Sequence, residues 1–450
     1  MYSPTRRSFI RQAACAALGA SGLVGTIWDL RKLNAATYSV AGDYKALVCV
    51  FLHGGNDGNN VIIPHDADGY AAYAAARSIL AIPQSSLLPL VLPDGDGRDF
   101  GFHPKLPELQ SLFNQGKLAL VTNVGTLVGP ITKTEYLSGS AAVPPELFSH
   151  ADQSVQWQTC APKKQVWTGW GGRTADLLSS MNSNTGVSLT ISVAGTNIFE
   201  VGNAVIPFQV SPTSTFALAG FNGTANANVR LQAFKELLAQ PHQNLLEQAY
   251  ADTVTRSIAD NEILLAIPPL NTTFPNTELG RQLKMVARFI GGRTNLGMQR
   301  QIFFCAVSGY DTHSGQLTAQ TNLLTELNQA LSAFYSATVE LGVEQQVTTF
   351  TASDFGRTFR SNGYGSDHGW GNHQFVLGGA VRGGRLYGAF PTLAIDGPDD
   401  TGQQGRWIPT TSVEEFSATM ASWFGVADSD LPTIFPNIGR FANPNLGFLS

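Results

Sequence analysis

Charged side chains are scarce in this sequence: Asp, Glu, Lys and Arg together make up 14% of the 450 residues, and the formal net charge is −5. No cluster of Lys or Arg lies beyond the N-terminal region, whereas proteins that bind nucleic acids present a basic surface to the phosphates. Beyond that region no apolar run approaches the roughly 20 residues of a membrane span. We therefore expect no nucleic-acid partner and no membrane span in the mature chain.

Cysteine is also rare, with four in the chain. Cys15 lies in an apolar N-terminal stretch, and Cys49, Cys160 and Cys305 remain, an odd number without a C-x-x-C spacing. This pattern argues against a disulfide framework and against a zinc ion held by cysteines. Cys49 and Cys305 lie inside strand-like apolar runs, so we expect buried thiols there.

The N-terminus has the features of an export signal. Residues 5–10 read TRRSFI, and a mildly apolar stretch rich in Ala and Gly follows at 13–27. Paired arginines ahead of a weakly apolar segment are typical of the twin-arginine signal. We predict a signal peptide over residues 1–37, export by the twin-arginine machinery, and a periplasmic or secreted mature protein. The alternative is the basic N-terminal helix of a cytoplasmic protein.

Residues 38–450 are predicted to form a single α/β domain. Apolar and β-branched runs typical of strands buried on both faces lie at 46–52, 118–124, 302–307 and 347–352. Apolar positions at helical spacing, at 279–290 and 324–341, predict core-facing helices ahead of the last two runs. This alternation indicates a doubly wound, mainly parallel central sheet with helices on both faces.

Two further segments complete this outline. Residues 186–228 are dominated by Thr, Ser, Gly, Asn and Val, and they are predicted to form a β-rich insertion or lid. A final amphipathic helix is predicted at 413–424, after the cap candidates Thr410, Thr411 and Ser412.

Polar segments follow three of the strand-like runs. They read HGGNDGNN at 53–60, SGYDTH at 308–313 and SDFGRT at 353–358, and DHGWGNH follows at 367–373. In open α/β sheets ligands bind beyond the carboxyl ends of the strands, so we expect these segments to meet at one edge. Four of the eight histidines lie in these segments.

The side chains in these segments suit a divalent metal ion. Mixed imidazole and carboxylate ligands favour zinc, with manganese, magnesium and calcium as alternatives. Taken singly, each segment also fits a structural role: a tight turn for GGNDG, a capping motif for DTH, and a turn residue paired with Arg357 for Asp354. The candidate metal ligands are Asp57, Asp311, His313, Asp354, His368 and His373.

Together with the twin-arginine start, the strand-end segments resemble the secreted family catalogued as domain of unknown function fifteen-oh-one. The later runs GGAVRGG at 378–384 and WFG at 423–425 also fit, so the resemblance covers nearly the whole mature chain. That family is grouped with the alkaline phosphatase and sulfatase superfamily. The resemblance implies a doubly wound sheet, a pair of metal sites and a nucleophile at a helix start.

The resemblance also implies roles for individual residues. Asp57 matches the carboxylate after the first strand, which ligates a metal and faces the nucleophile. Asp311 and His313 match the Asp and His of one metal site, and His368 matches the late His ligand, with His373 as its competitor. Asp354 matches the Asp of an Asp-His pair, but Phe355 replaces that His. This departure leaves open whether the site holds one ion or two, with Asp367 and His368 able to compensate.

The nucleophile that the resemblance implies is Ser149, which begins a helix-compatible run after Pro144 and Pro145. Ser149 and Asp152 also fit a helix cap, and this structural role is the alternative. Arg357 is the candidate for holding the non-bridging oxygens of a small anionic ester substrate, with backbone amides near residues 56–60 as the alternative. The predicted function is a metal-dependent hydrolase of phosphate or sulfate esters. The alternative is a non-enzymatic secreted protein that keeps the fold with a degenerate metal site.

Overall fold

The computed structural model describes residues 43–92, 99–163, 166–183, 187–212, 224–241, 244–267 and 269–450. The predicted signal peptide at 1–37 lies outside these residues. Within the described ranges, no helix is both long and apolar enough to cross a membrane.

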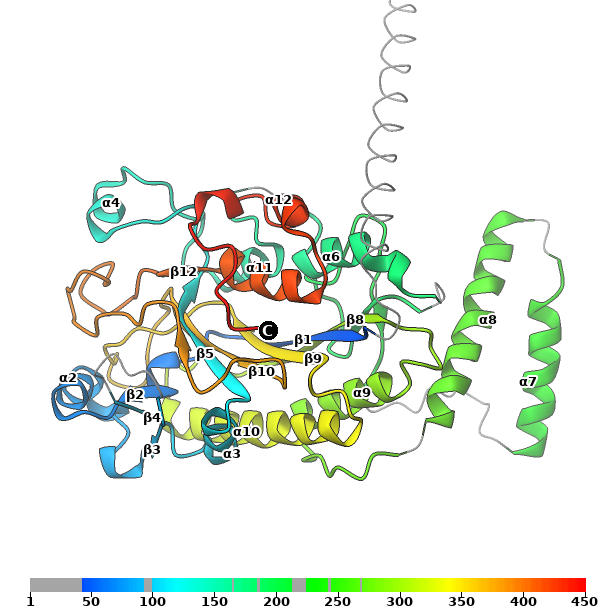
Figure 1. The fold of residues 1–450 in the computed structure, drawn as a ribbon, viewed down its shortest axis with the longest axis horizontal. Coiled ribbons are helices and arrows are strands. Elements are labelled where there is room, and N and C mark those ends of the chain that lie inside the picture. Colours follow the sequence, from blue (N-terminus) through cyan, green and yellow to red (C-terminus); the bar gives the residue numbers. More distant parts are fainter. Residues whose placement is uncertain are drawn as a thin grey trace, which may run out of the picture.

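A nine-stranded mixed sheet forms the centre of the described chain (Figure 1). Only β10 runs antiparallel to its neighbours, and the other pairs in this sheet are parallel. The strand order is β11 (Leu386–Tyr387), β5 (Leu118–Gly125), β10 (Asn372–Leu377), β9 (Val347–Ser353), β1 (Lys45–Leu52), β8 (Arg300–Val307), β6 (Thr190–Ser192) and β7 (Phe208–Gln209), and β12 (Thr411–Ser412) pairs with β5. A second, three-stranded sheet has the order β2 (Ile62–Pro64), β4 (Phe100–Phe102), β3 (Leu88–Pro89).

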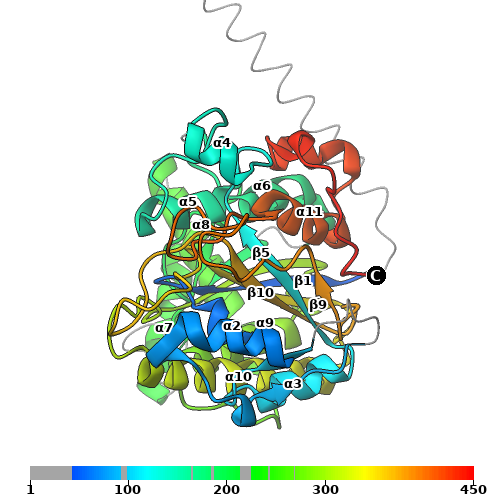
Figure 2. The same cartoon turned by 90° about the vertical axis from the view of Figure 1, so that its left-hand side faces the viewer.

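Helices cover both faces of the central sheet, as the alternating pattern predicts (Figures 1 and 2). Alternate residues of β1 point to opposite sides: Val48 and Val50 join one apolar cluster, and Cys49 and Phe51 join the other. The first cluster includes residues of α3 (Pro107–Asn114), α9 (Glu278–Gly291) and α10 (Gln316–Glu340). The second includes residues of α5 (His150–Thr159), α6 (Trp170–Leu178), α11 (Val413–Phe424) and α12 (Leu431–Ile434).

The remaining helices lie away from these two layers (Figure 1). They are α2 (Ala67–Arg77), α4 (Lys133–Ser138), α7 (Ala225–Leu238) and α8 (Leu245–Ala266). Short 3-10 turns are found at Gly58–Asn60, Ser78–Leu80, Gln84–Ser86, Ser179–Met181, Asp428–Asp430 and Ile438–Arg440.

The strongest sequence patterns are confirmed. The four apolar runs are β1, β5, β8 and β9, the two helical stripes are α9 and α10, and Ser412 caps α11 through Glu415 N. The segment predicted as a β-rich insertion has a different arrangement. Its strands β6 and β7 extend the central sheet, α7 begins within it at Ala225, and residues 213–223 lie outside the described residues.

Strand direction brings the polar segments to one edge of the sheet. β1 pairs in parallel with β8 and β9, and Leu52 lies opposite both Val307 and Ser353. The residues that follow these three strands therefore leave the sheet side by side. Because β10 is antiparallel to β9, its first residue, Asn372, lies at the same edge, and the loop that carries His368 arrives there.

Candidate metal centre

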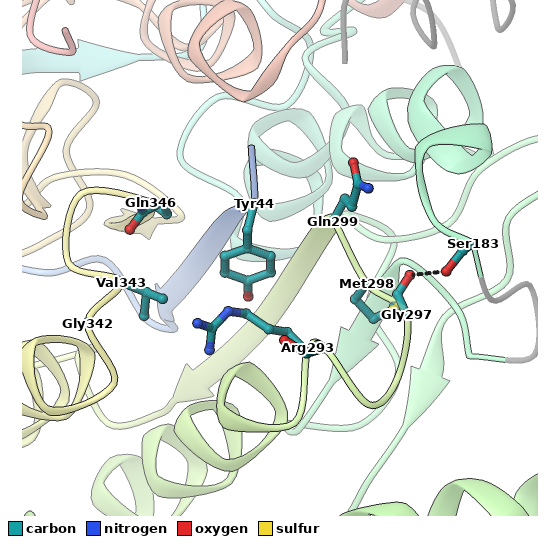
Figure 3. A pocket seen from close by; sticks show the side chains of 10 residues that line it. Tyr44, Ser183, Arg293, Gly297, Met298, Gln299, Gly342, Val343 and Gln346 are labelled. Carbon is teal, nitrogen blue, oxygen red and sulfur yellow. Dashed lines mark hydrogen bonds between the residues drawn. The ribbon is translucent and has the colours of Figure 1, made fainter. Parts of the chain in front are cut away.

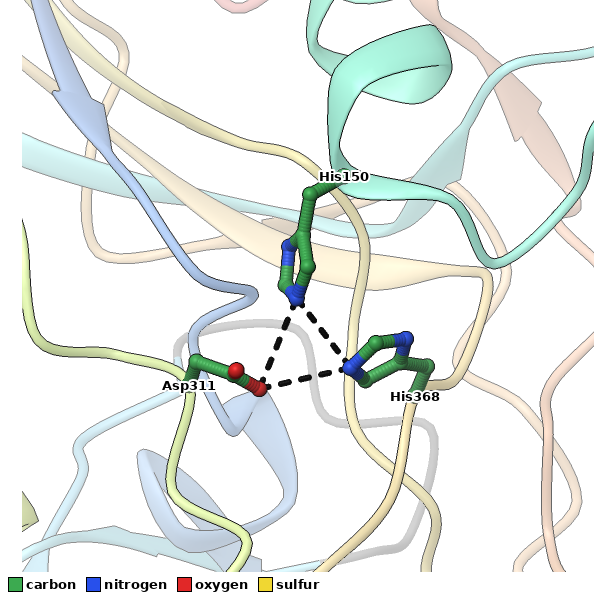
Figure 4. A group of neighbouring side chains, drawn as sticks. All are labelled: His150, Asp311 and His368. Atoms are coloured by element: carbon green, nitrogen blue, oxygen red, sulfur yellow. Dashed lines mark hydrogen bonds and ion pairs between the residues drawn. The ribbon is translucent and has the colours of Figure 1, made fainter.

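Three ligand atoms from distant parts of the chain meet beyond the carboxyl edge of the sheet (Figure 4). They are Nε2 of His150, Oδ1 of Asp311 and Nε2 of His368. His150 Nε2 lies 3.5 Å from Asp311 Oδ1 and 3.1 Å from His368 Nε2, and His368 Nε2 lies 3.3 Å from Asp311 Oδ1. Among the described residues, these three form the group of His, Cys, Asp and Glu that could hold a metal ion.

His313 adjoins this triangle. Its Nε2 lies 2.9 Å from His368 Nε2 and 3.2 Å from Asp311 Oδ1, so it is placed to act as a further ligand. His313 and Asp311 are each nearly half exposed, with 45% of the side-chain surface accessible, so the ligand atoms face solvent on one side. A catalytic metal site keeps such an open position, whereas a structural site is closed.

The second ring nitrogen of each histidine is held by an acceptor. His150 Nδ1 donates to Asp354 Oδ2 (2.6 Å), His368 Nδ1 donates to the Phe148 carbonyl (2.7 Å), and His313 Nδ1 donates to Asp367 Oδ1 (3.0 Å). This pattern is typical of metal-ligating histidines, because the acceptor fixes the tautomer and directs Nε2 to the metal. In all three rings Nε2 is therefore the nitrogen left to bind an ion.

The start of α5 positions two of these groups. His150 is the first residue of the helix, and Ser149 is its N-cap, with Oγ accepting from Asp152 N and donating to Asp152 Oδ2 (2.5 Å). Phe148, just before the cap, has a φ of 70°, which is unfavourable for a residue with a side chain. Strained backbone of this kind often lies at functional sites. Here it directs the Phe148 carbonyl to His368.

Asp354 is buried, with 2% of its surface exposed, and it supports the cluster from the sheet side. Its Oδ2 accepts from His150 Nδ1 and from Gly54 N (3.1 Å). Its Oδ1 has no hydrogen-bond partner, and His53 Nδ1 lies 3.9 Å from it. Gly54 has a φ of 114°, and a Cβ there would collide with the backbone nitrogen of Asp311, so the close approach of the two loops requires glycine.

Arg357 is buried and holds Asp311 in place. Its Nη1 donates to Asp311 Oδ1 (2.7 Å) and to the Gly54 carbonyl (3.1 Å), and its Nη2 donates to the Ser366 carbonyl. Burial would raise the pKa of Asp311, but the hydrogen bond and charge of Arg357 hold that pKa below its usual range. Burial lowers the pKa of His368 and also that of His53, so both imidazoles favour the neutral form. Ionised carboxylate and neutral imidazole are the forms that bind metal.

The spacing of the three ligand atoms fits a zinc ion. Ligands at 2.0–2.1 Å from zinc in tetrahedral geometry lie about 3.3 Å from one another. The three separations in the cluster are 3.1, 3.3 and 3.5 Å. The orphaned oxygen of buried Asp354 is also consistent with a cation nearby, because such atoms rarely lack a partner. The residues present therefore fit a divalent metal, with nitrogen-rich ligands that favour zinc.

Two of the predicted ligands lie elsewhere. Asp57 is buried against Arg77, whose Nη2 pairs with its Oδ2, and Gln316 Nε2 donates to the same oxygen. His373 is buried and stacks on Phe390 at 4.9 Å, and burial lowers its pKa to about 3. Its Nδ1 accepts from Asn123 N (3.2 Å). Neither belongs to the metal-compatible group, because each side chain is committed to other partners.

The other predicted site residues lie at or beside the cluster. Asp311 and His368 belong to the triangle, His313 adjoins it, and Asp354 lies behind His150 rather than at the centre. Arg357 does not point its Nη1 to open space, since that group already donates to Asp311 and Gly54. Ser149 is at a helix start, as predicted, and its hydroxyl makes the cap contacts with Asp152.

His150 is the member of the cluster that the sequence patterns did not single out as a candidate metal ligand. It lies some 160 residues before Asp311 and follows no predicted strand, so strand-end reasoning could not place it. The available signal was its rarity, as one of eight histidines, beside a Ser at a predicted helix start. Asp367, which the resemblance implied could compensate for Phe355 together with His368, contacts His313, and His53 became a site residue only through its contact with Asp354.

Solved structures that resemble this chain have low similarity. The PsFucS1 sulfatase from Pseudoalteromonas sp. has 9% identity and a TM-score of 0.36, over 90% of this chain and 73% of that one. The phosphonate monoester hydrolase SpPMH from Silicibacter pomeroyi has 8% identity and a TM-score of 0.34, over 85% and 73%. A protein in the alkaline phosphatase superfamily from Vibrio parahaemolyticus has 12% identity and a TM-score of 0.31, over 87% and 68%.

No curated protein matches the sequence. A family comparison does match, over residues 44–434, which is most of the chain. This match confirms the family that the strand-end segments predict. The chain belongs to the family described as "Protein of unknown function (DUF1501)".

Proposed function

We propose that the protein is a metal-dependent hydrolase of phosphate or sulfate esters. The observation that carries the proposal is the triangle of His150, Asp311 and His368, in which both histidines have Nδ1 held by an acceptor and Nε2 directed to a common point. We assign these three residues and His313 as the ligands of one divalent ion, preferably zinc. A zinc ion bound there supplies a Lewis acid and lowers the pKa of a coordinated water or hydroxyl.

The chain's own residues would prepare this site for an anionic ester. Arg357 orients Asp311 through Nη1, and Asp354 orients His150 through Oδ2. The exposed side of His313 and Asp311 leaves room for the substrate to approach the ligand atoms. The three carboxylates in and around the cluster, those of Asp311, Asp354 and Asp367, are each paired with Arg or His, so they repel an incoming anion less than free carboxylates would.

We also propose that the protein reaches the periplasm or the exterior by twin-arginine export, on the basis of Arg6 and Arg7 in the N-terminal segment. This pathway carries folded proteins, which suits a chain that acquires a metal ion before export. Replacing both arginines by lysine is expected to retain the protein in the cytoplasm, as cell fractionation would show. Normal export of the double variant would contradict this route.

A second candidate function is a secreted protein without enzymatic activity. It is favoured by the Ser149 hydroxyl, which is engaged with Asp152 as a helix cap. Metal binding alone does not separate the two candidates, because the triangle can serve a binding protein as well. Ester hydrolysis by the metal-loaded protein separates them.

The test combines metal analysis with an activity screen. Purified protein is expected to contain about one equivalent of zinc by elemental mass spectrometry and to hydrolyse generic phosphate or sulfate monoesters. His150→Ala is expected to lose both properties, whereas the control His65→Ala, which lies outside the cluster, keeps both. Bound metal without hydrolysis would favour the non-enzymatic protein. Failure to bind any divalent metal would contradict both the metal centre and the proposed hydrolase.

A further inference from the structure

A pocket of about 620 Å³ opens at the carboxyl edge of the central sheet. Its lining includes Val193 after β6, Gln209 in β7 and Ala306 in β8, together with Glu278 and Arg281 from the first turn of α9. Ligand pockets usually measure roughly 300–1,000 Å³, so this one has room for a small organic group.

The pocket borders the metal centre. His53 lines it, and His53 Nδ1 lies 3.9 Å from Asp354 Oδ1, the carboxylate that holds His150. Ser308 also lines it and lies three residues before Asp311, in the same loop. Tyr310 N donates to the His53 carbonyl (3.2 Å), which ties the two loops together. A substrate whose anionic group reaches the metal centre can therefore place its remaining part in this pocket.

The lining contains one carboxylate and one guanidinium, whose opposite charges offset each other. Glu278 and Arg281 are one helical turn apart and lie on the same face of α9. The pair therefore gives the lining no net charge that would favour an anion or a cation, and Arg281 Nη1 also donates to Asn276 Oδ1 (3.2 Å). A hydroxyl group both donates and accepts hydrogen bonds, so it can satisfy a carboxylate and a guanidinium together.

The uncharged polar residues of the lining also favour a ligand with hydroxyl groups. Gln209 and Ser308 offer amide and hydroxyl groups that both donate and accept. Among the described residues of the lining there is no Phe, Tyr or Trp, so the His53 imidazole is the one aromatic ring that those residues offer. We infer that this pocket binds a polyhydroxylated, uncharged alcohol, which is the alcohol part of the ester. The inference rests on the proposed hydrolase and specifies its substrate class.

A pocket at the opposite edge of the sheet supplies a matched control. It measures about 410 Å³ and is lined by Tyr44, Gln299 and Gln346, which precede β1, β8 and β9, and by Arg293 (Figure 3). Arg293 lies two residues after the end of α9, whereas Arg281 lies in its first turn. Arg281→Ala and Arg293→Ala thus remove the same side chain from pockets at opposite edges.

The experiment measures binding and turnover separately on the zinc-loaded full chain. Saturation-transfer NMR with glycerol, glucose and galactose reports binding of the alcohol without any chemistry. Steady-state kinetics compare glucose 6-phosphate and glucose 6-sulfate with hexyl phosphate and hexyl sulfate. We expect Arg281→Ala and Glu278→Ala to raise KM for the sugar esters about tenfold with kcat unchanged, and to leave the hexyl esters unaffected. Arg293→Ala should match the unmodified protein throughout.

The two arms distinguish this inference from the proposed function. If a polyol binds, and Arg281→Ala but not Arg293→Ala abolishes the signal, the inference stands even when no ester is hydrolysed, and only the proposed function fails. If esters are hydrolysed with equal KM for sugar and hexyl forms and no polyol binds, the inference is overturned and the hydrolase stands. Absence of both polyol binding and hydrolysis contradicts both.

Discussion

The two edges of the central sheet use polar residues in different ways. At the amino edge, Arg300 donates to the Phe424 carbonyl (2.8 Å) and to Asp43 Oδ2 (2.8 Å), and so ties the start of β8 to the end of α11 and to the chain before β1. At the carboxyl edge, three imidazole nitrogens and a carboxylate oxygen face one another. Lone pairs directed at each other repel unless a proton or cation lies between them.

This difference teaches how to separate structural from functional polar groups in one fold. Arg300 has hydrogen-bond partners that hold secondary-structure elements together, so its contacts stabilise the fold. In each histidine of the cluster at the carboxyl edge, Nδ1 donates a hydrogen bond to an oxygen of the protein. The other ring nitrogen, Nε2, is left to bind a metal ion. The pair of Arg77 and Asp57 shows that the carboxyl edge also contains buried charged groups that pair with each other.

The largest expected effect is that of His150→Ala on metal binding. Zinc sites bind with about 10–16 kcal/mol, so one ligand among three or four carries on the order of 4 kcal/mol, or about 10³-fold in Kd. We therefore expect zinc affinity to fall by that factor and ester hydrolysis to fall with it. Competition with a chromogenic chelator measures the change. Wild-type affinity in this variant would remove His150 from the ligand set, and Arg293→Ala is the control at the opposite edge.

The next effect tests the structural role of Asp57. Arg77→Met leaves the buried Asp57 carboxylate without its cation, which costs about 3–5 kcal/mol of unfolding free energy. Zinc content of the folded protein should not change. Lys133→Met, which breaks the exposed pair with Asp396, should cost about 0–1 kcal/mol in the same denaturant titration. Loss of bound zinc in folded Arg77→Met would restore Asp57 as a metal ligand.

Asp354→Asn should have an intermediate effect on zinc binding. The amide can still accept from Gly54 N, but it no longer gives His150 the charge of a carboxylate. Loss of such support typically weakens metal binding 10–100-fold, and we expect that range here. The matched variant Asp43→Asn at the amino edge should leave zinc affinity unchanged. A loss as large as that of His150→Ala would instead indicate that Asp354 binds the metal directly.

Ser149→Ala has the smallest expected effect of the four variants. It distinguishes a helix cap from a nucleophile at Ser149. As an N-cap, Ser149 contributes about 1 kcal/mol, so the variant should unfold at slightly lower denaturant concentration. If Ser149 is also the nucleophile, ester hydrolysis disappears while zinc content is retained. Thr277→Ala removes the corresponding cap of α9 and serves as the control for a stability change alone. Full activity in Ser149→Ala would leave only the cap.

The sequence predicts those features that depend on local pattern. Residues 46–52 and 347–352 are apolar without interruption, which is the composition of strands buried on both faces, and both are strands. Polar residues directly after such strands must lie at the carboxyl edge, so Asp311 and Asp354 could be placed near each other without a structure. The helix predicted at 413–424 after three cap candidates is α11, and one of those candidates, Ser412, caps it and forms a capping box with Glu415.

Only the tertiary structure decided which of these residues share the centre. Asp57 and Asp311 both follow central strands. Arg77 on α2 forms an ion pair with Asp57, whereas Asp311 lies in the cluster with the two histidines. His150 belongs to the cluster because α5 begins near the carboxyl edge of the central sheet. His368 belongs to it because β10 runs antiparallel to β9, so the loop before β10 reaches the same edge. The partner of a polar side chain depends on residues that are distant in sequence, whereas strand and cap patterns depend on residues that are adjacent. Local patterns therefore determined the edge of the sheet, and long-range packing determined which His and Asp side chains meet there.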